Sequence, residues 1–376
     1  MCIAEGSGLD TQRLGENFAG VAAHGEQVAL FFYAHLFLTH PEVRDMFPVS
    51  MATQRDRFLT ALGRIVADAG DTGALAPFLQ DLGRDHRKFG TVAAHYPAVG
   101  ESLLATLKHF TGAAWTPDLE QAWLEAYLLI SDVMIQAEET DAAPASWNAR
   151  VIGYERRTVG TALLRVAPEQ PLSYRPGQSV AVECPDRPRL WRYYSIANAP
   201  RLDGTLDFHV GIVDGGAVST ALVTRPPQWV RLGAPVGACT WDSRSKRPVV
   251  MAAGGTGLAP LKAIIEQVSQ QPSPPGITLI FGARNSSDLY DLADLRKMAA
   301  QWPHFEVTPV AEVDNAGTGC VTGTIADALA QRGTWREHDA YVCGSSAMVE
   351  ATVSRLRSLG TSRERIFIED FGWSSW

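Results

Sequence analysis

Four polar and aromatic side chains near the middle of the chain could together bind a phosphate and an aromatic ring. Arg192 and Ser195 flank two tyrosines, Tyr193 and Tyr194, and an apolar run follows them. On one strand, this pattern would supply a cation for a phosphate, a ring to lie on an isoalloxazine and a hydroxyl near the flavin N5. An ordinary amphipathic strand would have the same composition. The neighbouring segments decide between the two interpretations.

A glycine turn that leads into a helical segment follows at residues 215–222. Such a turn offers free backbone N–H groups and the positive end of a helix dipole to a pyrophosphate. The candidate contacts are Gly216, Val218, Ser219 and Thr220. A plain loop with a helix cap is the alternative, and the Arg192 segment upstream favours phosphate binding.

A second glycine turn comes directly after a buried-strand pattern at residues 247–253. It consists of Gly254, Gly255, Thr256 and Gly257, and Pro260 suits the first turn of a helix after it. Glycines here would let the backbone approach a pyrophosphate closely. The third glycine of the usual dinucleotide fingerprint is absent, so the turn alone is a weak signal.

Three polar side chains in the first part of the chain lie on apolar helical stripes: Tyr33, His86 and Glu138. Their apolar neighbours at helical spacing are Leu30 and Phe37 for Tyr33, Leu79, Leu82 and Phe89 for His86, and Tyr127, Ile130 and Met134 for Glu138. From spacing alone, a hydrogen-bonded core histidine is favoured over a metal ligand. Three polar groups that face one core nevertheless indicate a cofactor.

The distribution of proline separates a first part of the chain that can be helical from a remainder rich in strands and turns. Only five of the 22 prolines precede Pro144, so the first part can be largely helical. From Arg150 onward short strands alternate with turns and should form a small antiparallel barrel. Strand patterns at 278–281 and 340–343, separated by helical segments, predict a parallel doubly wound sheet at the end. The fold class is therefore multidomain: all-α, then antiparallel β-barrel, then α/β.

Composition excludes several function classes. The formal net charge of -8 argues against nucleic acid or an anionic membrane as the main partner. No run is long and apolar enough for a membrane span, and the N-terminus lacks the order of a signal peptide. The cysteines are odd in number and scattered, which favours a reducing cytoplasm over a disulfide framework. They are Cys2, Cys184, Cys239, Cys320 and Cys343.

Several segments of the helical part resemble the globin domain of flavohaemoglobins. They are Phe31-Phe32-Tyr33, Met46-Phe47-Pro48, Gln54-Arg55, Asp85-His86-Arg87-Lys88, Tyr96 to Glu101, and Ala126-Tyr127 leading to Glu138. Their order and spacing match, most clearly in the ten-residue step from His86 to Tyr96. The chain between Phe47 and Gln54 is shorter than is usual in the family, which leaves the distal assignment of Gln54 open.

The resemblance implies a role for each of these residues around a haem b. His86 would be the proximal iron ligand, with Tyr96 and Glu138 orienting it. Tyr33 would donate a hydrogen bond to bound dioxygen, with Gln54 beside it. Phe47 would pack on the haem.

The rest of the chain resembles the ferredoxin reductase family, in which an FAD-binding barrel leads into a nicotinamide-binding domain. Tyr174 to Gln178, the Arg192 segment and the turn from Gly254 to Pro260 follow one another in the family's order. Cys343-Gly344 resembles the late Cys-Gly pair beside the nicotinamide, although Ser345 replaces the usual proline. Phe371 matches the C-terminal aromatic residue that shields the flavin, with Trp376 as a rival.

Together these resemblances imply a flavohaemoglobin with a globin domain at 1–143, an FAD-binding barrel at 148–245 and an NAD(P)-binding domain at 246–376. The implied activity is nitric oxide dioxygenation: electrons from NADH or NADPH pass through FAD to the haem, where nitric oxide and dioxygen give nitrate. We expect small-molecule partners only, no membrane span, and a cytoplasmic monomer. The alternatives are a haem-linked reductase of peroxides or quinones, and a gas-binding sensor with its own reductase. Nitrate production would distinguish a nitric oxide dioxygenase from both alternatives.

Overall fold

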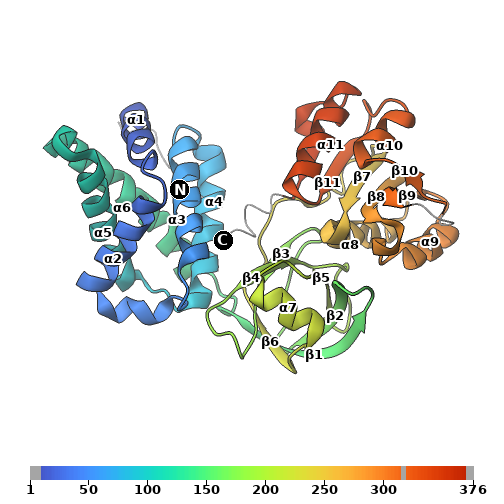
Figure 1. Ribbon diagram of the computed structural model, residues 1–376, viewed down its shortest axis with the longest axis horizontal. Helices are drawn as coiled ribbons and strands as arrows, with labels where there is room; N and C mark the ends of the chain where they lie inside the picture. Colours follow the sequence, from blue (N-terminus) through green and yellow to red (C-terminus); the bar gives the residue numbers. More distant parts are fainter. Residues whose placement is uncertain (1–9, 315–318, 370–376) are drawn as a thin grey trace. The chain divides into compact units, whose positions relative to one another are not determined.

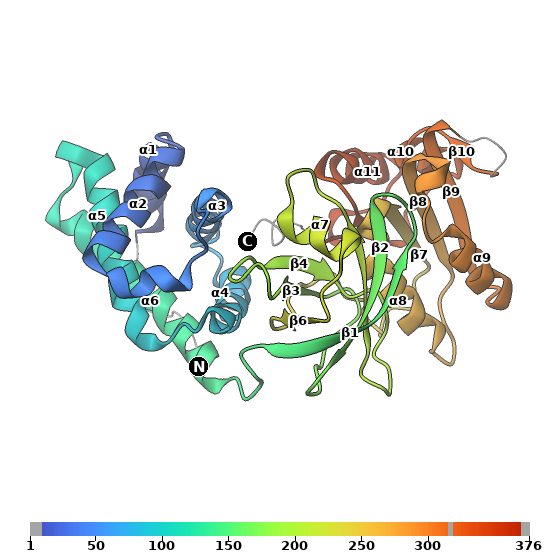
Figure 2. The ribbon, with the colours of Figure 1, turned by 60° about the horizontal axis from the view of Figure 1, so that its bottom comes forward.

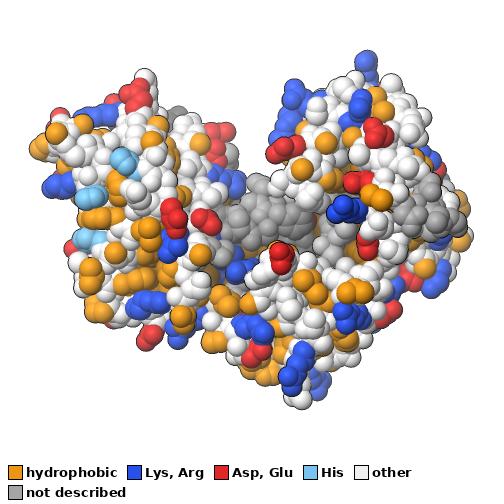
Figure 3. Space-filling model, viewed as in Figure 1, with side chains coloured by type: hydrophobic (Ala, Val, Ile, Leu, Met, Phe, Trp, Pro, Cys, Tyr) orange, Lys and Arg blue, Asp and Glu red, His pale blue; other side chains and the backbone are white. Residues whose placement is uncertain are grey.

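The computed structural model describes residues 10–314 and 319–369 of the chain. Two compact units divide between Ser146 and Trp147 (Figure 1). No helix in the described part of the chain is both long and apolar enough to cross a membrane. On the face in view in Figure 3, acidic and basic side chains are interspersed over both units.

The first unit is all-helical, as the low proline content predicts. Its α-helices are α1 (Thr11–Ala22), α2 (Glu26–Thr39), α3 (Ala52–Ala67), α4 (Thr72–His86), α5 (Tyr96–Thr111) and α6 (Pro117–Thr140). Short 3-10 helices lie at η1 (Pro41–Met46), η2 (Arg87–Phe89), η3 (Ala93–His95) and η4 (Gly112–Ala114). One apolar core, built from α1, α2, α3, α5 and α6, includes Phe32, Leu36 and Leu107.

Two glycines allow the helices that carry the candidate site to pack closely. A Cβ atom at Gly83 of α4 would collide with the Met134 backbone of α6. A Cβ atom at Gly100 of α5 would lie 2.5 Å from the ring of Tyr127 on α6. Because both contacts need a bare backbone, they fix α4 and α5 against α6.

The second unit begins with a six-stranded antiparallel sheet in the order β4-β3-β6-β1-β2-β5. Its strands are β1 (Trp147–Arg156), β2 (Thr161–Pro168), β3 (Ser179–Glu183), β4 (Arg192–Ser195), β5 (Leu206–Gly211) and β6 (Trp229–Leu232). A bridge between Ile196 and Phe208 joins the two edges, so the sheet closes into the barrel that the short strands predict (Figure 2). Helix α7 (Ala217–Thr224) follows β5.

A parallel sheet in the order β10-β9-β8-β7-β11-β12 completes the second unit. Its strands are β7 (Val249–Gly254), β8 (Ile277–Asn285), β9 (Phe305–Asp314), β10 (Val321–Thr322), β11 (Asp339–Cys343) and β12 (Ile366–Ile368). Helices α8 (Leu258–Ser269) and α9 (Leu292–Gln301) pack on one face, and α10 (Ile325–Gln331) and α11 (Ser346–Ser358) on the other. Short 3-10 helices are η5 (Gly255–Gly257), η6 (Ser286–Asp288) and η7 (Arg363–Arg365). The multidomain fold class is confirmed.

The order of this parallel sheet predicts where a ligand would bind. From β7 the chain moves through β8 to β9 and β10, and it returns to the other side of β7 with β11. The loops after β7 and β11 therefore leave the sheet toward opposite faces. Open α/β sheets bind ligands at such a switch point, outside the carboxyl ends of the strands.

Candidate functional site

Tyr33, a residue of α2, lies in a cluster of aromatic side chains. Its buried ring is 5.6 Å from the ring of Phe47 and 5.8 Å from those of Phe37 and Phe58, centroid to centroid. The Tyr33 hydroxyl donates a hydrogen bond of 3.4 Å to the backbone carbonyl of Gln54. Burial raises the Tyr33 pKa, so the phenol remains a donor near neutral pH. The structure thus brings Tyr33, Phe47 and Gln54 together. The contact of Gln54 with Tyr33 is made by the Gln54 backbone carbonyl and not by its side chain.

His86 is the last residue of α4, and its ring orientation is fixed by that helix. Its Nδ1 donates a 2.7 Å hydrogen bond to the carbonyl of Leu82. This bond selects the tautomer in which Nε2 carries a lone pair, the form that binds a metal. Burial lowers the pKa of His86, which further favours the neutral ring. The donor chemistry therefore fits an axial haem ligand.

Tyr96 and Glu138 form a buried pair between α5 and α6. The Tyr96 hydroxyl donates to Glu138 Oε1 at 2.7 Å, and the Tyr127 hydroxyl donates to the Tyr96 carbonyl at 2.5 Å. Burial raises the pKa of Glu138. The resemblance implied that Tyr96 and Glu138 orient His86, whereas the structure gives the imidazole N–H of His86 to the Leu82 carbonyl.

A charged pair beside His86 escaped the sequence analysis. Asp85 and Lys88 form an ion pair although both side chains are buried. The Lys88 ammonium also lies 4.8 Å from the centre of the Phe89 ring. The Asp-His-Arg-Lys segment was the available signal, but it did not distinguish a buried pair from surface charges.

The flavin candidate strand is β4, and its side chains alternate as a strand requires. Tyr193 and Ser195 are buried on one face, and Arg192 and Tyr194 are half-buried on the other. Arg192 donates to the Trp191 carbonyl at 2.8 Å. Arg192 and Tyr194 therefore share a face, as a phosphate-binding cation and a stacking ring would need.

Ser195 is bound to a carboxylate that sequence analysis passed over. Its hydroxyl donates to Glu369 Oε1 at 2.6 Å, and the Ser179 hydroxyl donates to the same atom at 2.7 Å. Glu369 Oε2 has no hydrogen-bond partner among the described residues. Burial raises the pKa of Glu369 to about 7. The predicted shielding residue Phe371 and its rival Trp376 lie outside the described residues.

The first glycine turn opens α7 as predicted. Ser219 Oγ accepts from the Val213 N–H at 3.1 Å and donates to the Gly216 carbonyl at 3.1 Å. The Thr220 N–H donates to the Gly216 carbonyl at 3.0 Å, which commits it to the helix. Val218 is buried, so its side chain cannot meet a phosphate, whereas the backbone N–H groups of the first helical turn could.

The second glycine turn meets the end of β11 at the switch point of the parallel sheet. Gly255 has a positive φ of 53°, and a Cβ atom at Gly257 would collide with the Cys343 carbonyl. A Cβ atom at Gly344 would lie 3.3 Å from the Gly254 backbone. Cys343 is buried, and burial raises the pKa of its thiol. The turn from Gly254 through Thr256 to Gly257 and the Cys343-Gly344 pair therefore form one backbone cradle.

Comparisons with known proteins divide the chain in the same order. Three family models match it: Globin at residues 30–134, Oxidoreductase FAD-binding domain at 156–241, and Oxidoreductase NAD-binding domain at 251–354.

Two flavohemoproteins are similar over nearly the whole chain. The protein of Bacillus subtilis is 28% identical, over 93% of this chain and 93% of its own length. That of Deinococcus radiodurans is 29% identical with the same coverage. A reductase component of a naphthalene 1,2-dioxygenase system from Pseudomonas putida is 32% identical over 63% of this chain and 72% of its own.

Among solved structures, a flavohemoglobin from Malassezia yamatoensis with bound FAD and heme has a TM-score of 0.80 and 18% identity. The match covers 96% of this chain and 98% of that one. The FAD/NAD-binding domain of a nitric oxide dioxygenase from Vibrio cholerae has a TM-score of 0.54 and 21% identity. That match covers 60% of this chain and 98% of that one.

The buried Glu369 should make the stability of the second unit depend on pH. Its pKa of about 7 exceeds the ordinary 4.5, so the folded state keeps a proton that the unfolded state releases. The free energy of unfolding should therefore fall by on the order of 3 kcal/mol as pH rises from the unfolded pKa to the folded pKa of Glu369. Below the unfolded pKa, Glu369 is protonated in both states and this loss of stability is absent.

Glu369→Gln should remove the part of the pH dependence of stability that is due to this carboxyl group. Urea unfolding of the parent and the variant at about pH 5 and pH 7 measures it, with Glu350→Gln, an exposed glutamate of α11, as the control. Identical pH dependence in the parent and Glu369→Gln would contradict the assignment.

Proposed function

The chain belongs to the flavohaemoglobin family, and we propose that it is a nitric oxide dioxygenase supplied with electrons by NADH or NADPH. One observation carries the proposal: globin, FAD-binding and NAD-binding regions follow one another in a single chain whose relatives match it along 93% of its length. The fold of the M. yamatoensis flavohemoglobin, solved with FAD and heme, supports the same order.

We divide the chain into a globin domain at 1–143, an FAD-binding domain at 148–245 and an NAD(P)-binding domain at 246–376. The separation of two compact units between Ser146 and Trp147 supports the first boundary. The change from an antiparallel to a parallel sheet before Val249 supports the second.

In the globin domain, His86 would hold haem b through Nε2, because its Nδ1 is bound to the Leu82 carbonyl. A haem bound there would supply the iron at which dioxygen and nitric oxide combine to nitrate. Tyr33 would donate its hydroxyl proton in a hydrogen bond to the bound oxygen, with Gln54 at its side and Phe47 against the haem. The buried Tyr96 and Glu138 pair would hold α5 and α6 together.

In the reductase part, Arg192 would pair with a flavin phosphate, Tyr194 would stack on the ring, and Ser195 would lie near N5 with Tyr193 packed beneath. FAD bound there would accept a hydride and pass electrons on singly. The Glu369 carboxyl, bound to Ser195, can hold or release a proton near neutral pH.

Backbone groups would hold the phosphates of both nucleotides. The turn with Gly216, Val218, Ser219 and Thr220 would face the FAD pyrophosphate. The cradle of Gly254, Gly255, Thr256, Gly257, Cys343 and Gly344 would take the nicotinamide dinucleotide. We assign Phe371 to the flavin ring on the sequence resemblance alone.

We further propose that the protein is a cytoplasmic monomer whose partners are small molecules: dioxygen, nitric oxide and the nicotinamide dinucleotide. No disulfide joins the cysteines of the described residues, Cys184, Cys239, Cys320 and Cys343, which supports a reducing compartment. The net charge of -8 argues against a nucleic-acid partner.

Tyr33→Phe should speed dioxygen dissociation from the reduced protein. A hydrogen bond to a partly anionic ligand contributes about 1.5 to 3 kcal/mol, so the rate should rise about 10- to 100-fold. Flash photolysis or stopped-flow mixing measures the rate. Tyr154→Phe, which removes a hydroxyl from the barrel, should leave it unchanged. An unchanged rate in Tyr33→Phe would remove Tyr33 from the oxygen site.

His86→Ala tests the whole proposal. The variant should lose haem and form no nitrate, yet reduce ferricyanide with NADH or NADPH near the parent rate, because the reductase folds on its own cores. The exposed-histidine variant His109→Ala should keep both activities. Conversely, Gly257→Val should keep haem and bind oxygen after chemical reduction, but lose turnover with the dinucleotide. Full nitrate synthesis by His86→Ala would overturn the globin assignment.

A further inference from the structure

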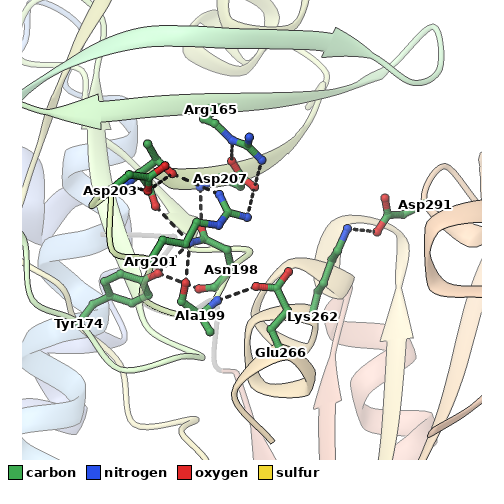
Figure 4. A network of polar contacts seen from close by, with 11 residues as sticks. Arg165, Tyr174, Asn198, Ala199, Arg201, Asp203, Asp207, Lys262, Glu266 and Asp291 are labelled. Atoms are coloured by element: carbon green, nitrogen blue, oxygen red, sulfur yellow. Dashed lines mark hydrogen bonds and ion pairs between the residues drawn. The ribbon is translucent and has the colours of Figure 1, made fainter. Parts of the chain in front are cut away.

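A hydrogen bond joins the flavin candidate strand to the helix that follows the second glycine turn. The N–H of Ala199, four residues after Ser195, donates to Glu266 Oε2 at 2.9 Å (Figure 4). Glu266 lies on α8, whose first residue follows Gly257 directly. One carboxylate therefore connects the element that would carry the nicotinamide phosphates to the element that would carry the flavin ring.

The barrel side of this bond is held rigidly by Asn198, whose side chain is completely buried. Its amide donates to the Ala199 and Thr205 carbonyls and to the Tyr174 hydroxyl, at 2.7, 3.1 and 3.0 Å. Its oxygen accepts from the Asp207 N–H at 2.6 Å (Figure 4). All these partners lie on the barrel, so the direction of the Ala199 N–H is fixed.

The Asp207 carboxylate strengthens the same region. It accepts from Arg165 and from Arg201, each at 2.7 Å in its shortest bond. These two guanidinium groups hold the pKa of Asp207 at about 2, below its usual range, against the opposing effect of burial. The loop that presents Ala199 is therefore charge-paired as well as hydrogen-bonded.

The helix side is tied down one turn before Glu266. Lys262 of α8 binds Asp291 Oδ2 at 2.5 Å, and Asp291 is completely buried. Arg157, at the end of the β1–β2 hairpin, lies 3.7 Å from Asp291 and binds Asp294 at 2.9 Å. A second link from the barrel thus reaches the same helix through Asp291.

The apolar contacts of α8 are of a different kind. Leu258, Leu261 and Ile264 are fully buried and belong to a core that also includes Cys239 and Trp241 from the segment before β7. Burial of this kind is non-directional, so it holds α8 in place without setting its register. The hydrogen bond from Ala199 to Glu266 adds a directional contact between the barrel and α8.

We propose that Glu266 is a positioning residue for hydride transfer, which fixes the register of α8 and its glycine turn against the strand that carries Ser195. The inference rests on the proposed function, because it concerns transfer from a nicotinamide to FAD. A misplacement of about 1 Å can cost on the order of 100-fold in rate, so one lost register contact is measurable.

The test compares three variants of the FAD-loaded full chain. Glu266→Ala removes the acceptor, Glu266→Gln keeps a carbonyl oxygen for the Ala199 N–H, and Glu350→Ala removes an exposed glutamate of α11. Anaerobic stopped-flow reduction of the flavin, over a range of NADH and NADPH concentrations, gives a limiting rate and a dissociation constant for each.

We expect the limiting rate of Glu266→Ala to fall at least about tenfold while its dissociation constant changes less than about twofold. Glu266→Gln should stay within about threefold of the parent, and Glu350→Ala should equal it. A parent-like limiting rate in Glu266→Ala, a loss confined to the dissociation constant, or no rescue by glutamine would each overturn the positioning role.

Amide hydrogen exchange at Ala199 gives a readout that does not depend on turnover. In the parent, this amide should exchange at least about tenfold more slowly than in Glu266→Ala. If Glu266→Ala does not fold, an unprotected Ala199 amide in the parent decides against the inference. If neither dinucleotide reduces the parent flavin, the proposed function fails and the inference fails with it. If the parent is reduced and Glu266→Ala is reduced equally fast, only the inference fails.

Discussion

The reductase depends on the close approach of two backbone segments at the switch point of its parallel sheet. Gly257 meets the Cys343 carbonyl so closely that no side chain fits between them, and a Cβ atom at Gly344 would lie 3.3 Å from the Gly254 backbone. This contact requires bare backbone, and the cradle that we propose for the nicotinamide dinucleotide is built on it. The barrel must then be held at a fixed distance from this cradle, which explains why directional polar contacts, such as Glu266 to Ala199, join the two.

In the helical unit, the polar groups of the candidate haem site are held by hydrogen bonds in apolar surroundings. His86, Tyr33 and Glu138 each lie in apolar surroundings, and each has a hydrogen-bond partner: the Leu82 carbonyl, the Gln54 carbonyl and the Tyr96 hydroxyl. Because desolvation favours neutral forms, the imidazole stays unprotonated and the phenol stays protonated. These are the states in which one can bind iron and the other can donate a hydrogen bond.

Sequence alone predicted the features of the fold that depend on hydrophobic periodicity and on the positions of glycine and proline. The helical first part, the antiparallel barrel, the parallel sheet and the placement of Tyr33 and Glu138 on buried faces all followed from these patterns. Sequence alone did not predict that Glu369, 174 residues from Ser195, would accept a hydrogen bond from it. That partner is set by tertiary packing, and local spacing carries no record of a contact between distant segments. The bond from His86 to the Leu82 carbonyl is local to α4, but residue types alone do not show which acceptor an imidazole N–H will choose.

Nitric oxide dioxygenation is tested by the ratio of nitrate formed to dinucleotide oxidised, with nitric oxide and dioxygen both supplied to the purified protein. Each nitrate requires one electron and each hydride carries two, so we expect about two nitrate ions for each NADH or NADPH. A ratio near zero, with the dinucleotide still consumed, would contradict it and show that the electrons leave the protein for another acceptor.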